Sequence, residues 1–271
     1  MKRVTKIIIL IAAVIAIIAL GYMFVVKPHN EAVKKYDDAY NCVYEKNKSL
    51  DASINELQKI IDSGEQPFEE IYKTNALEEL QTAEKTKVVL PEKMPWRTKD
   101  IIAATESINV DVDYYDILHG LRVARVNLEN SIKQLKQVTN PNEKFIIERL
   151  SRVEGVKGIE AVTEDNDPNG LLNKQGGYTA SIYFEYEGIE ADGDYIDIVD
   201  KGTDGGGCIE VYANPQDAEK RAEYINSVDI FYSAGSRDVV GTCLIRVSDY
   251  LTASQQKDIE ERIVKELIEL D

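Results

Sequence analysis

The chain has 271 residues, of which 44% are hydrophobic and 30% are charged, and this ordinary composition excludes a largely disordered chain. The formal net charge is −16, and it is concentrated in the C-terminal half. Residues 1–140 hold 19 basic and 20 acidic side chains, whereas residues 141–271 hold 13 and 28. Such an acidic half would repel phosphate backbones, so no nucleic acid is expected as a partner. The charge step near residue 140 indicates two units with different surfaces.

A stretch of twenty uncharged residues, Ile7 to Val26, lies near the N-terminus. At about 1.5 Å per residue, a helix of this length spans roughly 30 Å, the thickness of a bilayer's hydrocarbon core. Lys2, Arg3 and Lys6 precede it, and no acidic residue lies on that side. By the positive-inside tendency, the sequence predicts a single-pass cell-membrane anchor whose N-terminus is cytoplasmic and whose remaining chain is extracellular.

Two other kinds of segment compete with a retained anchor. A cleaved signal peptide could use the small residues of 19–21 (ALG), but the apolar run continues past them and exceeds the usual signal core of about 7–15 residues. A lipoprotein signal needs a cysteine just after the run, and the first cysteine is Cys42. Retention is therefore favoured, with the lipid bilayer as the partner of residues 7–26.

Residues 28–139 carry a helical pattern. Apolar side chains recur mostly every three or four residues, first between about Asn30 and Ile61 and most clearly between Ile117 and Val138. Pro67, Pro91 and Pro95 interrupt this pattern and separate the helices. The pattern predicts an antiparallel helical bundle of about three or four helices, which would act as a spacer.

From residue 140 onward the apolar period changes to two, between further short helices. Strands are predicted at residues 158–163, 178–187, 195–199, 208–212 and 239–247, and helices after Asn140, Asn214 and Thr252. This order predicts an α+β fold with a mainly antiparallel sheet and helices packed on one face. The predicted domains are a cytoplasmic tail with the transmembrane anchor (1–27), the helical bundle (28–139) and an acidic α+β head (140–271).

The three cysteines do not form a disulfide framework. Cys42 lies in a helical stretch, whereas Cys208 and Cys243 lie in separate predicted strands. Alternation places Cys243 on the core side of the sheet with Ile245, and Cys208 on the solvent side with Glu210. Because opposite faces make a bridge between the two strand cysteines awkward, unpaired thiols are expected.

Three blocks of the C-terminal half resemble a known family. They are 161–184 (AVTEDNDPNGLLNKQGGYTASIYF), 201–225 (KGTDGGGCIEVYANPQDAEKRAEYI) and 239–263 (VVGTCLIRVSDYLTASQQKDIEERI). In this order they resemble the C-terminal domain of uncharacterised surface proteins of Gram-positive bacteria, some labelled extracellular matrix-binding-like. The resemblance covers about residues 140–270, and the helical part is similar only loosely to bundle modules of those proteins. It implies an outward-facing binding or scaffolding role and supplies no activity.

The strongest local motif is 165–170 (DNDPNG), which matches the first half of a calcium loop, D-x-D-x-N-G. Oxygen ligands from Asp165, Asp167 and Asn169 could converge on Ca²⁺, and the glycine permits the sharp turn. The twelfth position is Gly176, where a bidentate glutamate is expected, so binding would be weak or would borrow a carboxylate such as Glu164. The competing interpretation is a hydrogen-bonded Asx turn between two strands, which the same residue types favour.

The sequence offers poor catalytic constellations. His29 and His119 stand in neither a Ser/His/Asp nor a metal-ligand spacing, and residues 140–271 hold no histidine. Residues 201–207 (KGTDGGG) lack the spacing of a phosphate-binding loop and predict a flexible strand connection.

Tyrosines of the second predicted strand could form a glycan- or peptide-binding face, although sheet propensity alone would also select them. They are Tyr178, Tyr183 and Tyr186. Sheet propensity is the favoured interpretation of these tyrosines. The predicted anchor, the helical spacer and the acidic head favour a non-catalytic extracellular interaction or scaffolding protein of a bacterial cell envelope, with a protein or glycan partner. An envelope sensor with a short cytoplasmic tail and an extracellular hydrolase are the alternatives.

Overall fold

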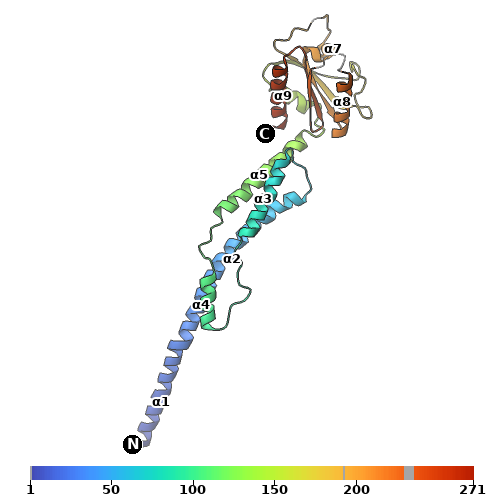
Figure 1. Ribbon diagram of the computed structural model, residues 1–271. Helices are drawn as coiled ribbons and strands as arrows, with labels where there is room; N and C mark the ends of the chain where they lie inside the picture. Colours follow the sequence, from blue (N-terminus) through green and yellow to red (C-terminus); the bar gives the residue numbers. More distant parts are fainter. Residues whose placement is uncertain (1, 192, 229–234) are drawn as a thin grey trace. The chain divides into compact units, whose positions relative to one another are not determined.

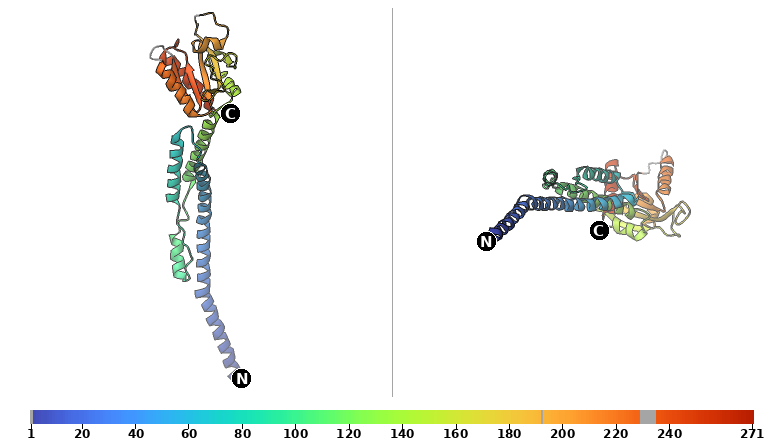
Figure 2. Two further views of the ribbon diagram at one scale, coloured as in Figure 1. Left: turned by 90° about the vertical axis from the view of Figure 1, so that its right-hand side faces the viewer. Right: turned by 90° about the horizontal axis from the view of Figure 1, so that it is seen from below.

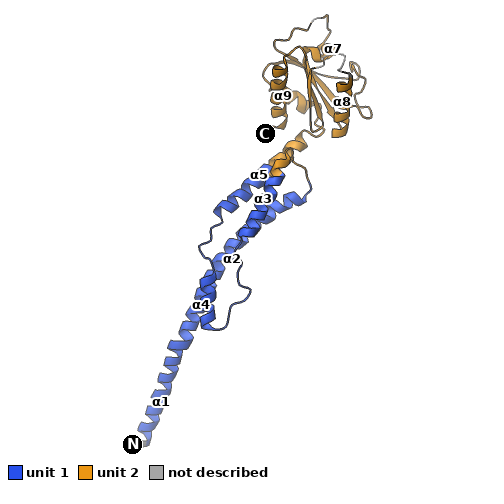
Figure 3. Cartoon of the chain, viewed as in Figure 1, with its two compact units in different colours: residues 1–64, 73–127 blue, residues 65–72, 128–271 orange. Residues whose placement is uncertain are grey.

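The computed structural model describes residues 2–191, 193–228 and 235–271 (Figure 1). The chain divides into two compact units (Figure 3). Unit 1 comprises residues 1–64 and 73–127 and is helical, whereas unit 2 comprises residues 65–72 and 128–271 and contains the sheet. The expected α+β class is confirmed, as is the long apolar helix at the N-terminus.

Unit 1 begins with α1 (Lys2–Gly21), which passes through a π-helical stretch (Tyr22–Val26) directly into α2 (Lys27–Asp62). The apolar first part of this continuous helix is long enough to cross a membrane, and its side chains are exposed. Figure 2 shows a bend where α1 meets α2. The π-helical stretch accounts for the bend, because its wider turn interrupts the regular ladder of α-helical hydrogen bonds.

Three further helices follow: α3 (Glu70–Thr86), α4 (Thr98–Ser107) and α5 (Tyr115–Gln137), the last of which continues into unit 2. The Lys87 ammonium lies 2.6 Å from the Asp51 carboxylate, so the chain has returned along α2 by the end of α3. At α4 the direction reverses. The chain meets α2 first at His29, where Nδ1 lies 3.0 Å from Thr98 Oγ1, and then at Lys46, where Nζ donates to the carbonyl oxygen of Val112 at 2.8 Å.

The predicted antiparallel bundle stays a prediction: α3 runs opposite to α2, but α4 and α5 follow one another in the same direction. Arg125 of α5 lies 3.0 Å from Glu56 of α2, farther along α2 than the Lys46 contact, so both helices run in the same direction as α2. The cause is the non-helical segment 88–97, which carries the chain back along α2 before α4 begins. Pro91 and Pro95 keep this segment from becoming another helix, as the sequence indicates.

Unit 2 holds a five-stranded sheet in which every pair is antiparallel. The strand order is β1-β2-β3-β5-β4. The strands are β1 (Val156–Ala161), β2 (Tyr178–Tyr186), β3 (Gly206–Tyr212), β4 (Ser236–Val240) and β5 (Cys243–Val247). The predicted antiparallel sheet is confirmed.

Two predicted strands differ in the structure. Residues 195–199 lead into a short helix, α7 (Ile198–Lys201), because the Asp197 carboxylate accepts the N–H of Asp200 at 2.8 Å and caps it. The predicted strand 239–247 is the end of β4, a tight turn and β5. Gly241 makes this turn with a φ of 61°, and an added Cβ would lie 2.4 Å from the carbonyl oxygen of Val138.

Helices cover both faces of the sheet, so the prediction of helices on one face is wrong. On one face, α6 (Glu143–Leu150) and α9 (Ala253–Ile268) pack against a core that includes Ile182, Ile209 and Ile245. On the other face, α8 (Pro215–Val228) packs against Tyr212 and Leu244. Figure 1 shows α9 and α8 on opposite sides of the sheet. The central strand β3 is consequently buried along its whole length.

Side chains cap the N-termini of α9 and α6, the two helices on the first face of the sheet. Thr252 caps α9, as the sequence predicts, and forms a capping box with Gln255. At α6 the cap is Asn142, whose side chain accepts the N–H of Phe145 at 2.9 Å, and not the predicted Asn140. The main part of unit 2 starts within α5 at residue 128, and the predicted boundary at 139/140 stays a prediction of where a fragment can be cut.

Candidate functional site

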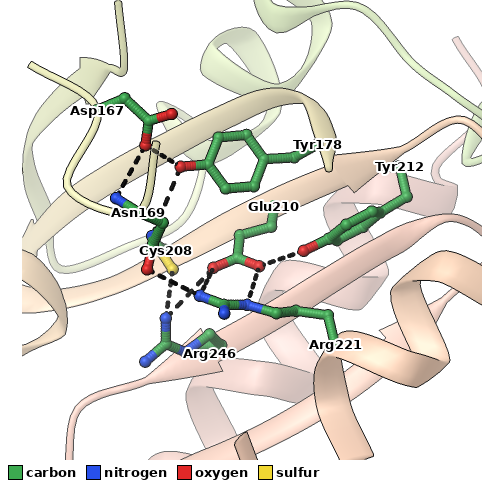
Figure 4. Close-up of polar contacts among 8 residues, drawn as sticks. All are labelled: Asp167, Asn169, Tyr178, Cys208, Glu210, Tyr212, Arg221 and Arg246. Carbon is green, nitrogen blue, oxygen red and sulfur yellow. Dashed lines mark hydrogen bonds and ion pairs between the residues drawn. The ribbon is translucent and has the colours of Figure 1, made fainter. Parts of the chain in front are cut away.

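The second face of the sheet holds a buried cluster of charges centred on Glu210 of β3 (Figure 4). Arg221 of α8 donates through Nε to Glu210 Oε2 at 3.1 Å, and Arg246 of β5 donates through Nη1 to Oε1 at 3.3 Å. The Tyr212 hydroxyl donates to Oε2 at 2.6 Å. Three groups from two strands and a helix thus satisfy one carboxylate that has no exposure to water. We call these four residues the Glu210 cluster.

Local structure explains why these side chains meet. Alternation along β3 puts Glu210 and Tyr212 on the face opposite Ile209, and Arg246 lies on the same face of the neighbouring strand. On α8, the Asn214 side chain accepts the N–H of Asp217 at 3.0 Å and fixes the start of the helix. Arg221 then stands two turns into the helix, directly over the strand carboxylate.

The two arginines keep their charge in this buried setting. Burial by itself would lower the pKa of Arg221, but the nearby Glu210 carboxylate outweighs it and the pKa is raised. For Arg246 burial again acts to lower the pKa, but the charge and the hydrogen bond of the Glu210 carboxylate act to raise it, and the pKa is raised overall. Two guanidinium groups around one carboxylate make a desolvated ion cluster, in which removing one partner leaves an uncompensated buried charge.

Cys208 lies beside this cluster, with its Sγ 3.9 Å from Arg246 Nη1. Burial raises the pKa of its thiol to about 12, so it is protonated at neutral pH. A protonated and fully buried thiol is a poor nucleophile. The sequence placed Cys208 and Glu210 on the solvent side of the sheet, and this is wrong because α8 and the α7 region cover that face.

The predicted calcium ligands lie at the rim of the same cluster. Asn169 Oδ1 accepts from Arg221 Nη2 at 3.0 Å. The Asp167 carboxylate accepts the N–H groups of Leu172 at 2.8 Å and Asn169 at 3.0 Å, together with the Tyr178 hydroxyl. Burial would raise the pKa of Asp167, but these hydrogen bonds outweigh it and lower the pKa. The structure therefore brings Asp167 and Asn169 together and gives both of them protein partners.

Asp165 is exposed, and it does not share these hydrogen bonds. A calcium ion would bind this loop only in competition with the donors that hold Asp167 and Asn169. The Asx-turn interpretation of the sequence is seen directly, since Asp167 Oδ1 accepts the N–H of Asn169, two residues farther along the chain, at 3.0 Å. Calcium binding by Asp165, Asp167 and Asn169 stays a prediction.

The residues of the cluster were missed at the level of sequence, although a signal was present. Glu210 stands between Ile209 and Val211, and Arg246 stands between Ile245 and Val247. Opposite charges embedded in two apolar strands are typical of a buried pair. Of the three tyrosines that the sequence offers as a binding face, Tyr178 and Tyr183 are buried, and Tyr186 is partly buried against the core of the other sheet face. The three therefore form no common exposed face.

An open groove of about 580 Å³ lies between α8 and the loop after β1. Arg221 and Asn169 reach its wall from the Glu210 cluster, and Lys220 and Tyr224 of α8 line it as well. Tyr224 is exposed, and the guanidinium carbon of Arg221 lies 5.7 Å from its ring centroid. The groove therefore combines cations, amide groups and an aromatic ring, a mixture that suits hydrogen bonding and stacking on a polar ligand.

Comparison of the chain with protein-family models, with curated proteins and with solved structures found no match, and no family is assigned to it on that basis.

Proposed function

We propose that this chain is a membrane-anchored interaction protein of a bacterial cell envelope, with an acidic head that binds a protein or glycan partner outside the cell. The observation that carries the proposal is the continuous helix Arg3–Asp62, whose apolar first part is exposed along its length. Exposed apolar surface on this scale is costly in water, at about 25 cal/mol per Å², and a bilayer removes that cost. Arg3 and Lys6 before the apolar stretch favour a cytoplasmic N-terminus.

The helical unit is then a spacer, and the head is the recognising part. The Glu210 cluster supports a role in recognition because it fixes α8 and the loop that together form the groove wall. The thiol of Cys208, which lies beside the cluster, is protonated at neutral pH, and this favours a positioning role for the cluster over nucleophilic chemistry. We also propose that the chain belongs to the Gram-positive surface proteins that are labelled extracellular matrix-binding-like.

The topology is testable with the native cysteines. Cys42 is exposed on α2, whereas Cys208 and Cys243 are buried in the head. A membrane-impermeant maleimide added to intact, wall-stripped cells should label the protein once, at Cys42, and the Cys42→Ser variant should stay unlabelled. Labelling that appears only after the membrane is permeabilised would place the head in the cytoplasm and overturn the proposal.

The binding role is testable at the groove. The double variant Lys220→Ala/Tyr224→Ala removes a cation and a ring from the groove wall, while Lys257→Ala removes an exposed lysine from α9. Immobilised full-length chain in detergent should capture a specific envelope protein or glycan, and the groove variant should capture less of it than wild type or Lys257→Ala. Equal capture by all three would exclude the groove as the binding site.

A further inference from the structure

The segment 88–97 runs back along α2 toward the apolar helix. Its start is held at Asn47, whose Nδ2 donates to the carbonyl oxygen of Val88 at 2.8 Å. Its end is held at His29, whose Nδ1 lies 3.0 Å from Thr98 Oγ1. Eighteen residues of helix separate the two contacts on α2, about 27 Å of rise. Ten residues of extended chain reach about 33 Å, so the segment makes this return in a single, nearly straight pass.

The lower end of the segment lies close to the edge of the predicted membrane span. His29 follows Val26, the last residue of the apolar stretch, by three positions, or about 4.5 Å along the helix. The polar headgroup layer of a bilayer is roughly 5–7 Å deep on each side of a hydrocarbon core about 30 Å thick. Residues next to Thr98 are consequently at headgroup depth when Val26 lies at the edge of the hydrocarbon. Both views of the helices place α4 beside the part of α2 nearest α1 (Figure 1, Figure 2).

The side chains at this end have the character of a membrane-surface contact. Trp96 is 78% exposed, and the guanidinium carbon of Arg97 lies 4.8 Å from its ring centroid. Met94 is also exposed. Tryptophan is the residue type that prefers the bilayer interface, because its ring is apolar and its N–H still finds a polar partner there.

The charge near Trp96 is opposite to that of the whole chain. Lys93, Arg97 and Lys99 are exposed cations, and Glu92 is the one acidic residue between positions 92 and 99. Lys27, at the end of the apolar stretch, lies 3.9 Å from the Glu31 carboxylate on α2, so this pair leaves the local balance unchanged. In a chain of net charge −16, such a local excess of positive charge suits the phosphate groups of lipids.

Packing of α4 against α2 holds the end of segment 88–97 in this position. Ile101 of α4 and Ile108, which directly follows the helix, are buried against Ala32, Tyr36 and Val43 of α2. Packing at both ends of α4, together with the His29 contact, fixes the residues that directly precede the helix.

We propose that residues 93–97 form a second membrane contact, in which Trp96 and Met94 enter the headgroup layer and Lys93 and Arg97 bind lipid phosphates. The contact would set the direction in which α2 leaves the bilayer, because it adds a second point of attachment beside the helix axis. The proposal rests on the proposed membrane anchor.

The experiment uses the fact that Trp96 is the only tryptophan in the sequence. The full-length chain is reconstituted into vesicles of phosphatidylcholine and phosphatidylglycerol, and its fluorescence is recorded with iodide in the water or with lipids brominated near the headgroup end of the acyl chains. The matched control is Trp96→Phe/Tyr115→Trp. Tyr115 is 72% exposed, close to the value for Trp96, but it lines a pocket with Lys46, about 26 Å farther along α2 than His29.

The proposal predicts that Trp96 emits at shorter wavelength than the control tryptophan, is quenched by brominated lipid and is protected from iodide. Lys93→Glu/Arg97→Glu should reduce the bromine quenching in vesicles with phosphatidylglycerol. If Trp96 and the control tryptophan behave alike in vesicles that retain the protein after alkaline carbonate extraction, the contact is wrong and the anchor stands. Protection from iodide without bromine quenching would indicate a protein contact and also overturn the proposal. Release of the chain by carbonate would overturn the anchor and the contact together.

Discussion

At the scale of single residues, Glu210 is the side chain on which the head most depends. Its buried carboxylate compensates two partly buried guanidinium groups and accepts the Tyr212 hydroxyl. Glu210→Gln should lower the free energy of unfolding of the head by about 3–5 kcal/mol, because the arginines then lack a counter-charge. Denaturant unfolding followed by near-ultraviolet circular dichroism measures the change. Glu219→Gln, an exposed position on α8, is the control and should change stability by less than about 0.5 kcal/mol. Equal stability of the two variants would mean that the cluster carries no net stabilisation.

Asp167 should make the head sensitive to acid. Its pKa is lowered from the ordinary value of 3.8, since its hydrogen bonds outweigh the effect of burial. A group with a lowered pKa in the folded state contributes stability that is complete above the unfolded pKa and is lost as the pH falls through the folded pKa. The stability difference between wild type and Asp167→Asn should therefore be constant from neutral pH down to about pH 5 and shrink below about pH 4. Thermal midpoints across this range test it, and a difference that does not vary with pH would contradict it.

Asp165 gives the cleanest test of calcium binding, because it is exposed and its removal leaves the bonds of Asp167 in place. We expect binding with a dissociation constant no tighter than about 10⁻⁴–10⁻³ M, since the twelfth loop position is glycine. Millimolar calcium should then raise the thermal midpoint of wild type and not that of Asp165→Ala. Magnesium at matched ionic strength controls for general screening of the acidic surface. If magnesium acts as calcium does, or if the variant responds like wild type, the loop is a turn alone.

At the scale of elements, the β4–β5 turn is the most restricted connection in the head. Gly241 has a φ of 61°, and an added methyl group would lie against the Val138 carbonyl oxygen. Gly241→Ala should destabilise the head by more than the roughly 1–2 kcal/mol expected for a left-handed alanine. Gly188→Ala is the matched control, with a φ of 80° and no atom within 4 Å of the added Cβ. Thermal unfolding of the two variants separates backbone strain from close contact, and equal losses would show that the approach to Val138 costs nothing.

The local sequence predicts some helix ends correctly but does not predict every turn. Thr252 and Gln255 were predicted as a cap and form one, because both partners lie within a single turn of α9. The strand predicted at 239–247 failed, because Gly241 forms a two-residue turn in the middle of an otherwise apolar and β-branched run. The alternation within β4 and β5 is compatible with one long strand or with a hairpin, and only the pairing partner distinguishes them.

At the scale of the whole molecule, unit 2 includes residues that precede the predicted head. Val138 is fully buried in the head core, and its carbonyl oxygen accepts the N–H of Thr242 at 3.0 Å. A fragment that begins at residue 128 should therefore unfold at a higher midpoint than one that begins at residue 139. The loss of one buried valine corresponds to about 1.5–3 kcal/mol. Cooperative melts of the two fragments measure the difference, and equal midpoints would place the boundary where the sequence predicts it.

The sequence by itself determined the features that depend on near neighbours along the chain. These are the twenty-residue apolar run, the helical period of residues 28–138, the antiparallel strands and the cap at Thr252. Each follows from side-chain spacing, since the periods of helix and strand are fixed by backbone geometry.

Only the tertiary structure decided which segments meet. Glu210 and Cys208 alternate with apolar residues just as solvent-facing side chains do, and they are buried because α8 and the α7 region cover their face. Likewise, the period of α4 shows that it is a helix, but its direction depends on the return of segment 88–97 along α2. A periodic pattern shows which side chains share a face, but it does not show whether another element covers that face. The covering element lies far away in the sequence.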